Sequence, residues 1–153
     1  MNGACLCLDV GDVRIGVAVS RSGIIEEPLV TLERKGRKET LNEIERLAAE
    51  HRVATCVIGL PVLEGGKEGE QAEKTRAFGR SLARRLPGLH LAFWDERYSS
   101  AEAREHAAER VWDDKALIDR LAAAFILQNY LDHLGEQKNP FKKQEPREQN
   151  DQL

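Results

Sequence analysis

The order in which hydrophobic periodicity changes along the chain limits the folds open to it. Three short apolar stretches come first, at about residues 4–10, 13–20 and 24–32, and tight turns separate them. They predict an antiparallel three-stranded meander. Helical and strand periods then alternate, with strands expected at 53–60 and 89–95 and helices at 41–51, 68–86, 100–110 and 114–134. This order predicts an α/β fold, with a mixed five-stranded sheet and helices on both faces.

A chain of 153 residues suits one domain, which we place at residues 1–135. The remaining stretch, EQKNPFKKQEPREQNDQL at 136–153, is highly polar with a single aromatic residue, so a flexible tail is expected there. The apolar stretches are too short to span a bilayer, and the start MNGACLCLDV does not resemble a secretion signal. A cytoplasmic protein without a membrane partner is expected.

Three carboxylates, far apart in sequence, lie where core elements are expected to end. Asp9 follows the first apolar strand, Glu96 follows the strand at 89–95, and Asp119 lies early in the last helix. Small residues at Ala122 and Ala123, on the same helix face as Asp119, would let that helix approach a sheet closely. Gathered at one sheet edge, the three would form an oxygen-only site for Mg²⁺ or Mn²⁺, suited to phosphodiester cleavage.

Each carboxylate also has a structural interpretation that the sequence leaves open. Asp9 precedes Val10 and Gly11, a composition common in hairpin turns. The other two have basic neighbours with which they could form surface ion pairs: Arg97 or Arg104 for Glu96, and Lys115 or Arg120 for Asp119. The functional interpretation depends on all three occurring together at element ends, where open α/β sheets place their chemistry.

The cysteines and histidines indicate neither a disulfide nor a zinc site. Cys5 and Cys7 lie two apart on one strand, which separates their Cα atoms by roughly 6.5 to 7 Å, at the limit for a disulfide. Cys56 lies in another apolar strand, so all three cysteines are interpreted as small buried hydrophobic residues. The histidines are scattered and form no metal-binding spacing; they are His51, His90, His106 and His133.

The formal net charge of −3 argues against nucleic-acid binding through bulk positive charge. Basic residues do gather locally, at 34–38 before a helix and at Arg76, Arg80 and Arg84 along one face of the next helix. That arginine face is either a solvated surface or a track for a phosphate backbone.

A glycine-rich stretch, GLPVLEGGKEGEQ at 59–71, joins the fourth strand to its helix. It lacks the glycine spacing and the Ser/Thr of a Walker A loop, so a plain surface loop is favoured over a phosphate cradle.

Five segments in order resemble the YqgF (RuvX) family, pre-16S ribosomal RNA nucleases with a ribonuclease H-like fold related to Holliday junction resolvases. The segments are LDVGDVRIGVAVS, IEEPLVTL, VIGLPVLEGGKEGEQA, DERYSSAEA and IDRLAAAFILQNYLD, and they run from about residue 6 to residue 133. The resemblance implies that Asp9, Glu96 and Asp119 are the catalytic, metal-binding acids. It also implies a metal-dependent nuclease that acts on the 5′ end of precursor 16S ribosomal RNA.

Several positions depart from the family pattern and leave the substrate preference open. Asp12 and Arg21 change the charge beside the expected site, and Val62 stands where the family often has Asn. Arg14 and Arg97, next to the carboxylates, are candidates to neutralise a phosphate of the substrate, with a structural ion pair as the equal alternative.

Three other functions remain open from the sequence. The first is a Holliday junction resolvase-like DNA endonuclease, for which symmetric junctions would favour a homodimer over a monomer. The second is an actin-like ATPase, because DVGDVRIGVAVS also resembles the phosphate hairpin of that fold. The third is a non-catalytic nucleic-acid-binding factor in ribosome assembly or transcription. Metal-dependent cleavage that is lost in Asp9→Asn separates the nucleases from the other two.

Overall fold

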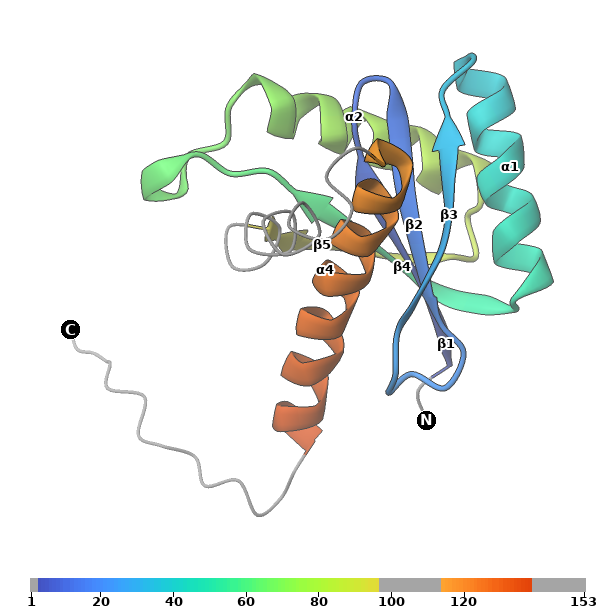
Figure 1. Ribbon diagram of the computed structural model, residues 1–153, viewed down its shortest axis with the longest axis vertical. Coiled ribbons are helices and arrows are strands. Elements are labelled where there is room, and N and C mark those ends of the chain that lie inside the picture. Colours follow the sequence, from blue (N-terminus) through green and yellow to red (C-terminus); the bar gives the residue numbers. More distant parts are fainter. Residues whose placement is uncertain (1–2, 97–113, 139–153) are drawn as a thin grey trace.

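The computed structural model describes residues 3–96 and 114–138, and its centre is a five-stranded sheet (Figure 1). The strands are β1 (Ala4–Val10), β2 (Arg14–Ser20), β3 (Glu27–Glu33), β4 (Val53–Leu60) and β5 (His90–Asp95), in the spatial order β3-β2-β1-β4-β5. β1 pairs antiparallel with β2, and β2 with β3, whereas β1, β4 and β5 run parallel. The predicted meander followed by parallel strands is confirmed. The carboxyl ends of β1, β4 and β5 therefore lie at one edge.

The third strand begins at Glu27, not at residue 24 as predicted. Hydroxyl groups explain the difference. The backbone N–H of Gly23 donates to Ser20 Oγ at 2.9 Å, and the N–H of Ile24 donates to Ser22 Oγ at 3.1 Å. These bonds satisfy the backbone outside any sheet and hold a turn. Ile24 and Ile25 were misread as strand residues, and both are about two-thirds exposed.

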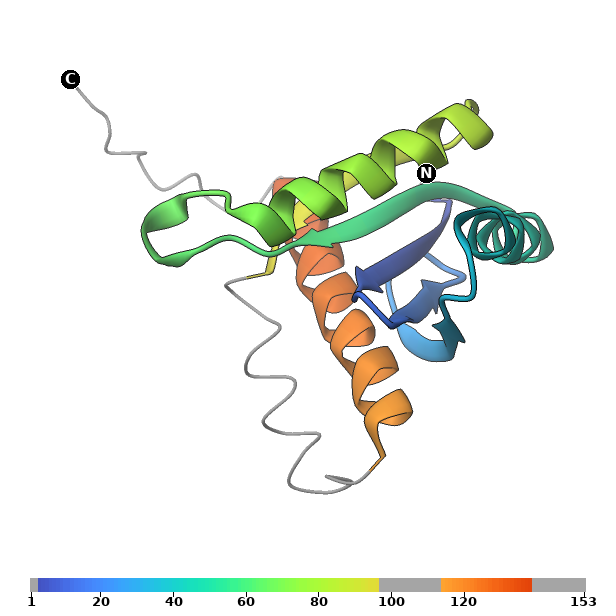
Figure 2. The same ribbon diagram turned by 90° about the horizontal axis from the view of Figure 1, so that it is seen from above.

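Two layers of helices cover the sheet (Figure 2). α1 (Arg37–Glu50) and α2 (Glu70–Arg85) pack on one face, and α4 (Lys115–Lys138) packs on the other. α1 begins four residues before the expected start at 41. The prediction of helices on both faces is confirmed. The helix expected at 100–110 lies outside the described residues.

Successive side chains of a strand point to opposite faces of the sheet, so the core forms two clusters. Leu6 and Leu8 of β1 face α1 and α2, where they join Ile44, Phe78 and other apolar residues. The intervening residues face α4 in a second cluster, whose buried members are Cys5, Cys7, Ala18, Val57, Ala123, Ala124, Ile126, Leu127 and Leu131. Cys5, Cys7 and Cys56 are buried thiols, as predicted.

The last helix is longer than predicted. Gly135 was expected just beyond its end, but α4 continues through Gly135 to Lys138. One glycine in a helix costs only about 1 kcal/mol relative to alanine, so it does not terminate a helix already held by packing. Residues 139–153 of the expected tail lie outside the described part of the chain. Among the described helices, none is both long and apolar enough to cross a membrane.

Candidate active site

Asp9 is a buried carboxylate at the carboxyl end of β1, with only 6% of its surface exposed. It shares the strand face of Cys5 and Cys7, so it points to the side that α4 covers. A tight turn follows at once, in which the N–H of Gly11 donates to the carbonyl of Arg14 at 2.9 Å. Carboxylates are rarely buried, so this residue is unusual in an otherwise apolar strand.

A glycine lies on each side of Asp9 in the sheet. Gly16 of β2 is its direct partner, and Gly59 of β4 follows Ile58, the partner of Leu8. A Cβ atom added to Gly16 would overlap the backbone oxygen of Asp119, and one added to Gly59 would lie 2.9 Å from Cδ1 of Ile126. Both strands therefore need glycine so that α4 can lie close to the sheet beside Asp9.

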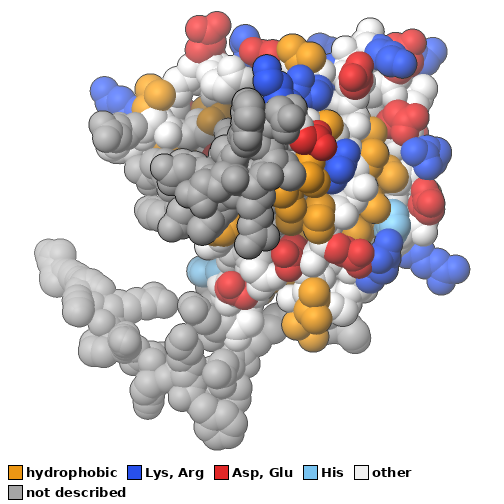
Figure 3. Space-filling model, in the orientation of Figure 1, with side chains coloured by type: hydrophobic (Ala, Val, Ile, Leu, Met, Phe, Trp, Pro, Cys, Tyr) orange, Lys and Arg blue, Asp and Glu red, His pale blue; other side chains and the backbone are white. Residues whose placement is uncertain are grey.

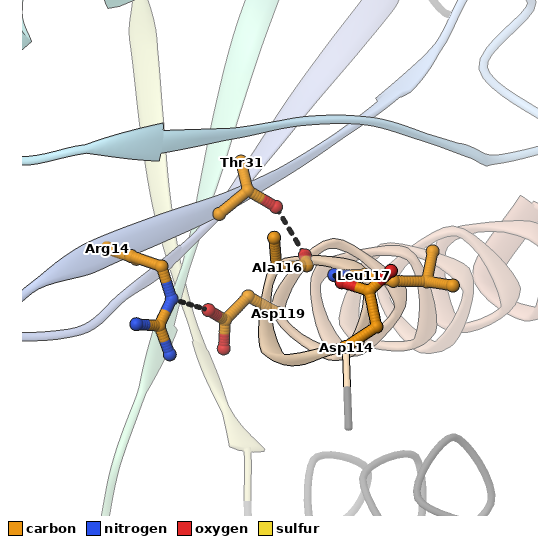
Figure 4. Close-up of polar contacts among 6 residues, drawn as sticks. All are labelled: Arg14, Thr31, Asp114, Ala116, Leu117 and Asp119. Atoms are coloured by element: carbon orange, nitrogen blue, oxygen red, sulfur yellow. Dashed lines mark hydrogen bonds and ion pairs between the residues drawn. The ribbon is translucent and has the colours of Figure 1, made fainter. Parts of the chain in front are cut away.

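Asp119 is carried to this point by α4, whose first turn is fixed in two ways (Figure 4). Asp114 accepts the N–H of Leu117 through its side chain at 3.1 Å, which caps the helix, and Thr31 of β3 donates to the carbonyl of Ala116. The alanines that were expected to bring Asp119 inward, 122 and 123, are fully buried, so the predicted close approach is confirmed.

The carboxylate of Asp119 forms an ion pair with Arg14 of β2. Nε of Arg14 donates to Oδ2 of Asp119 at 2.6 Å, across 105 residues of sequence. The side chains are 30% and 19% exposed, so the pair lies at the surface edge of the site. The sequence suggests Lys115 or Arg120 as a surface partner of Asp119, whereas this ion pair is made with Arg14.

Glu96 follows β5 and reaches back over β4. Its Oε2 lies 3.5 Å from the Cβ position of Gly59. Glu96 and Asp9 both lie within electrostatic range of Cys7: burial raises the pKa of this thiol well above its ordinary value, and the charges of Cys56, Asp9 and Glu96 raise it further. The charges of Asp9 and Glu96 thus both reach Cys7, a buried residue on the sheet face that α4 covers.

The three acidic residues lie around one part of the sheet, with Asp119 over Gly16 and Glu96 over Gly59, on either side of Asp9. Within residues 3–96 and 114–138, no group of three or more His, Cys, Asp or Glu side chains is placed to hold a metal ion. The assignment of Asp9, Glu96 and Asp119 as metal-binding residues stays a prediction. In the described structure the carboxylate of Asp119 is directed to Arg14 (Figure 4).

Of the predicted phosphate-binding arginines, Arg14 is the one beside the carboxylates, and Arg97 lies outside the described residues. Arg76 makes two bonds of 2.7 Å to Glu68, and its guanidinium lies 4.9 Å from the ring centre of Phe93. The other two arginines of that helix face, Arg80 and Arg84, are exposed. On the face shown in Figure 3, acidic and basic side chains alternate around the rim without a continuous basic surface.

The glycine-rich loop at 61–69 folds as a short surface loop. It contains one turn of 3₁₀ helix (Glu64–Gly66), and the φ angles of Gly65 and Gly66 are 87° and 89°, a region that favours glycine. The N–H of Leu63 donates to the carbonyl of Lys67 at 2.7 Å. The loop's own backbone groups are thus used to close it, in line with the favoured surface-loop interpretation.

Sequence reasoning missed the two glycines that flank Asp9. Each lies inside an apolar strand pattern, at Gly16 in RIGVAVS and at Gly59 in VATCVIGL. A glycine in a strand interior often marks close approach of another backbone, so the signal was present. The ion pair between Arg14 and Asp119 had no comparable signal in the sequence.

Comparison with protein families gives one match over most of the chain. The model of the family described as "RuvX: Holliday junction resolvase" matches residues 3–133. A protein of Agathobacter rectalis named "Putative pre-16S rRNA nuclease" is 39% identical over 141 residues, which cover 88% of this chain and 98% of that protein. One of the same name from Rhodobacter capsulatus is 42% identical over 137 residues, covering 87% of this chain and 86% of its own length.

Solved structures share the fold at low sequence identity. The resolvase of fowlpox virus, in complex with Holliday junction DNA, has a TM-score of 0.55 and 8% identity, covering 86% of this chain and 98% of its own. RuvC of T. thermophilus, also with a Holliday junction, has a TM-score of 0.52 and 14% identity, with coverages of 88% and 96%. They show a ribonuclease H-like fold, as expected from the sequence.

Proposed function

Because this chain belongs to the RuvX family and is a nuclease, we propose that it hydrolyses phosphodiester bonds at the 5′ end of precursor 16S ribosomal RNA. The observation that carries this proposal is the buried carboxylate Asp9, flanked by Gly16 and Gly59, with Asp119 and Glu96 over those two glycines. The proposed substrate is taken from the names of these relatives.

The proposed catalytic residues are the three acids. Asp9 and Glu96 already act on one region of the α4 face, and oxygen ligands of this kind suit Mg²⁺ or Mn²⁺. Asp119 joins them when its carboxylate turns away from Arg14. Such an ion, when bound, supplies a water of lowered pKa and stabilises the leaving 3′ oxygen, so that the products carry 5′-phosphate and 3′-hydroxyl ends.

Arg14 has two alternative partners in this proposal. In the described structure it neutralises Asp119 at 2.6 Å. When a substrate phosphate enters, the planar guanidinium can bind two of its oxygens, and Asp119 becomes available as a ligand. The arginine then positions the phosphate against Asp9. Arg97, Arg76, Arg80 and Arg84 remain proposed contacts to the rest of the nucleic acid.

A side-by-side cleavage assay tests the function. The full chain, highly purified, is incubated with structured precursor 16S RNA and with four-way junction DNA, each with Mg²⁺ or Mn²⁺ and with chelator. The expected product is RNA that is cut at a specific site. Asp9→Asn should cut neither substrate, whereas Asp132→Asn, which removes an exposed carboxylate from α4, should cut as the parent does.

One alternative keeps specific support. The family description and the two solved structures concern Holliday junction resolvases, so branched DNA is the second candidate substrate. Preference for junction DNA over precursor RNA in the same assay would replace the RNA proposal. Intact RNA and DNA at every metal concentration would leave a non-catalytic binding role.

A further inference from the structure

A pocket of about 520 Å³ lies on the sheet face opposite α4, between the start of α1, the middle of α2 and the β1–β2 turn. Four cationic side chains and one anionic side chain line it, which leaves a formal excess of three positive charges; they are Arg34, Lys35, Arg37, Lys74 and Asp12. This gathering of charge contrasts with the acidic chain as a whole, whose formal net charge is −3. The pocket is therefore suited to an anion.

Arg34 is the most firmly held cation of the pocket. Its Nη1 donates to the carbonyl of Gly11 at 2.7 Å, and its guanidinium lies 5.3 Å from the ring centre of Phe78. Those contacts fix the orientation of the side chain before any ligand arrives. The bond to Gly11 uses one of the five N–H donors of the guanidinium. Arg34 therefore has donors left for a ligand in the pocket.

The start of α1 adds to the positive potential. Gly36 is the N-cap, and no side chain caps the helix there. The first N–H groups of a helix favour a nearby anion, and Gly36 and Arg37 both line the pocket. Glu39, the acidic side chain of that first turn, also lies close to this N-terminus, with its Oε1 2.5 Å from the Cβ position of Gly36, and it offsets part of the positive potential there.

The single anion of the pocket opposes the cations weakly. Oδ1 of Asp12 lies 3.8 Å from Nζ of Lys74, and the side chains are 64% and 53% exposed. An exposed pair at this separation is weak, so a phosphate group can displace the contact. Asp12 thus reduces the charge of the pocket without closing it.

The pocket and the carboxylates lie on two sides of one sheet edge. Val10 lines the pocket and follows Asp9, and successive strand residues point to opposite faces. A nucleic-acid strand that crosses this edge meets the carboxylates on the α4 face and the four cations on the other face. Its backbone carries a phosphate at every nucleotide, so both sites can be filled by one strand.

We propose that this basic pocket binds a phosphate group of the substrate strand, a short distance along the backbone from the bond that the carboxylates cleave. The assignment rests on the proposed nuclease function and adds a second anchor to it. The phosphate bound in the pocket fixes the position of the strand. The carboxylates then cleave a bond at a fixed distance from that phosphate. Such a phosphate is either internal to the strand or a terminal 5′-phosphate.

The test uses the full chain without divalent ions, so that binding is measured apart from cleavage. Arg37→Gln/Lys74→Gln removes one exposed charge from each wall of the pocket, and Arg46→Gln/Arg52→Gln removes the same charge elsewhere. Fluorescence anisotropy gives the Kd of a labelled single-stranded RNA as salt is raised from about 50 to 200 mM. Two oligonucleotides are compared, one with a 5′-phosphate and one with a 5′-hydroxyl.

The pocket variant should bind more weakly, and its plot of log Kd against log salt should be flatter by about 0.7 for each lost contact. An equal loss with both oligonucleotides assigns an internal phosphate, and a loss confined to the 5′-phosphorylated one assigns a terminal phosphate. Equal affinity and slope in the pocket and control variants would overturn the proposal while leaving the nuclease function intact. A chain that cleaves nothing but shows the flatter slope would overturn the nuclease function alone.

Discussion

Gly16 lies directly under the backbone carbonyl of Asp119, so closely that β2 has no room for any side chain at this point. Gly16 is also the sheet partner of Asp9. One missing side chain therefore sets the distance between two of the three acids. Mutations that change this contact, the carboxylates or their partners give separate tests of the site.

Gly16→Ala should destabilise the fold by at least about 1–3 kcal/mol, because the new Cβ meets backbone that cannot move aside. It should also lower cleavage by displacing Asp119. Gly135→Ala is the matched control, since a Cβ there has open space and lies inside α4. It should raise stability by about 0.5–1 kcal/mol, measured by urea unfolding. Equal stability of the two variants would show that α4 does not lie close to β2.

Replacing each carboxylate by its amide should abolish cleavage but have different effects on stability. Asp9→Asn removes a buried charge that lies near Glu96, so the metal-free protein should be as stable as the parent or more stable. Asp119→Asn also removes the ion pair with Arg14 and should cost up to about 1 kcal/mol. Thermal melting with and without Mn²⁺ measures both effects. The parent should gain more in Tm from the ion than either variant does. Full activity in Asp119→Asn would remove that residue from the site.

In the proposed mechanism Arg14 controls whether Asp119 is available, so its loss should separate metal binding from substrate binding. Arg14→Gln should bind Mn²⁺ more tightly, because Asp119 loses its counter-charge, yet should show a higher KM. Arg14→Lys keeps the charge without the planar fork and should recover KM in part. Calorimetry of Mn²⁺ binding and steady-state cleavage provide the readouts. Unchanged Mn²⁺ affinity together with a lower Tm would assign Arg14 a purely structural role.

The arginine face of α2 can be tested at Arg80 and Arg84, since Arg76 is held by Glu68. Replacing both by Glu should weaken binding of all nucleic acids alike and flatten the salt dependence by about 0.7 units of slope per contact on single-stranded RNA. The same anisotropy titration as for the pocket measures it. If the slope equals that of the parent, these residues form a solvated surface.

Alkaline destabilisation should depend on the buried thiols. Burial raises the pKa of Cys56 from 9.0 to about 12. The thiol in the unfolded chain therefore loses its proton first, so this contribution to stability is complete below pH 9 and is lost as the pH rises towards 12. Urea unfolding at several pH values should show a shallower decline for Cys56→Ala than for the parent above pH 9. Parallel declines would indicate that Cys56 is accessible to solvent.

Elements with a strong periodic pattern were predictable. VATCVIGL forms β4 over exactly those residues, and the alanines of α4 are buried as their spacing indicated. Errors arose where side chains or packing override local preference. Ser20 and Ser22 hold a turn where apolar Ile24 and Ile25 suggested strand, and packing carries α4 beyond a glycine.

The acids of the proposed site, Asp9, Glu96 and Asp119, can be selected from strand ends and a helix face in the sequence. Their contacts cannot. The pairing of Arg14 with Asp119 joins residues 105 apart, and no local pattern encodes such a contact. The basic pocket is a similar case, because residues 34–37 and Lys74 meet only when α1 and α2 pack on the same sheet face.

The distance in sequence between Asp9 and Asp119 has a consequence during synthesis. β1 leaves the ribosome early, but the carboxylate of Asp119 arrives only with α4, after the other described strands have been made. Domains generally fold as complete units as the chain emerges. A nascent chain that ends before α4 cannot bring the proposed acids together, so the proposed site can form only after the last described helix has been made.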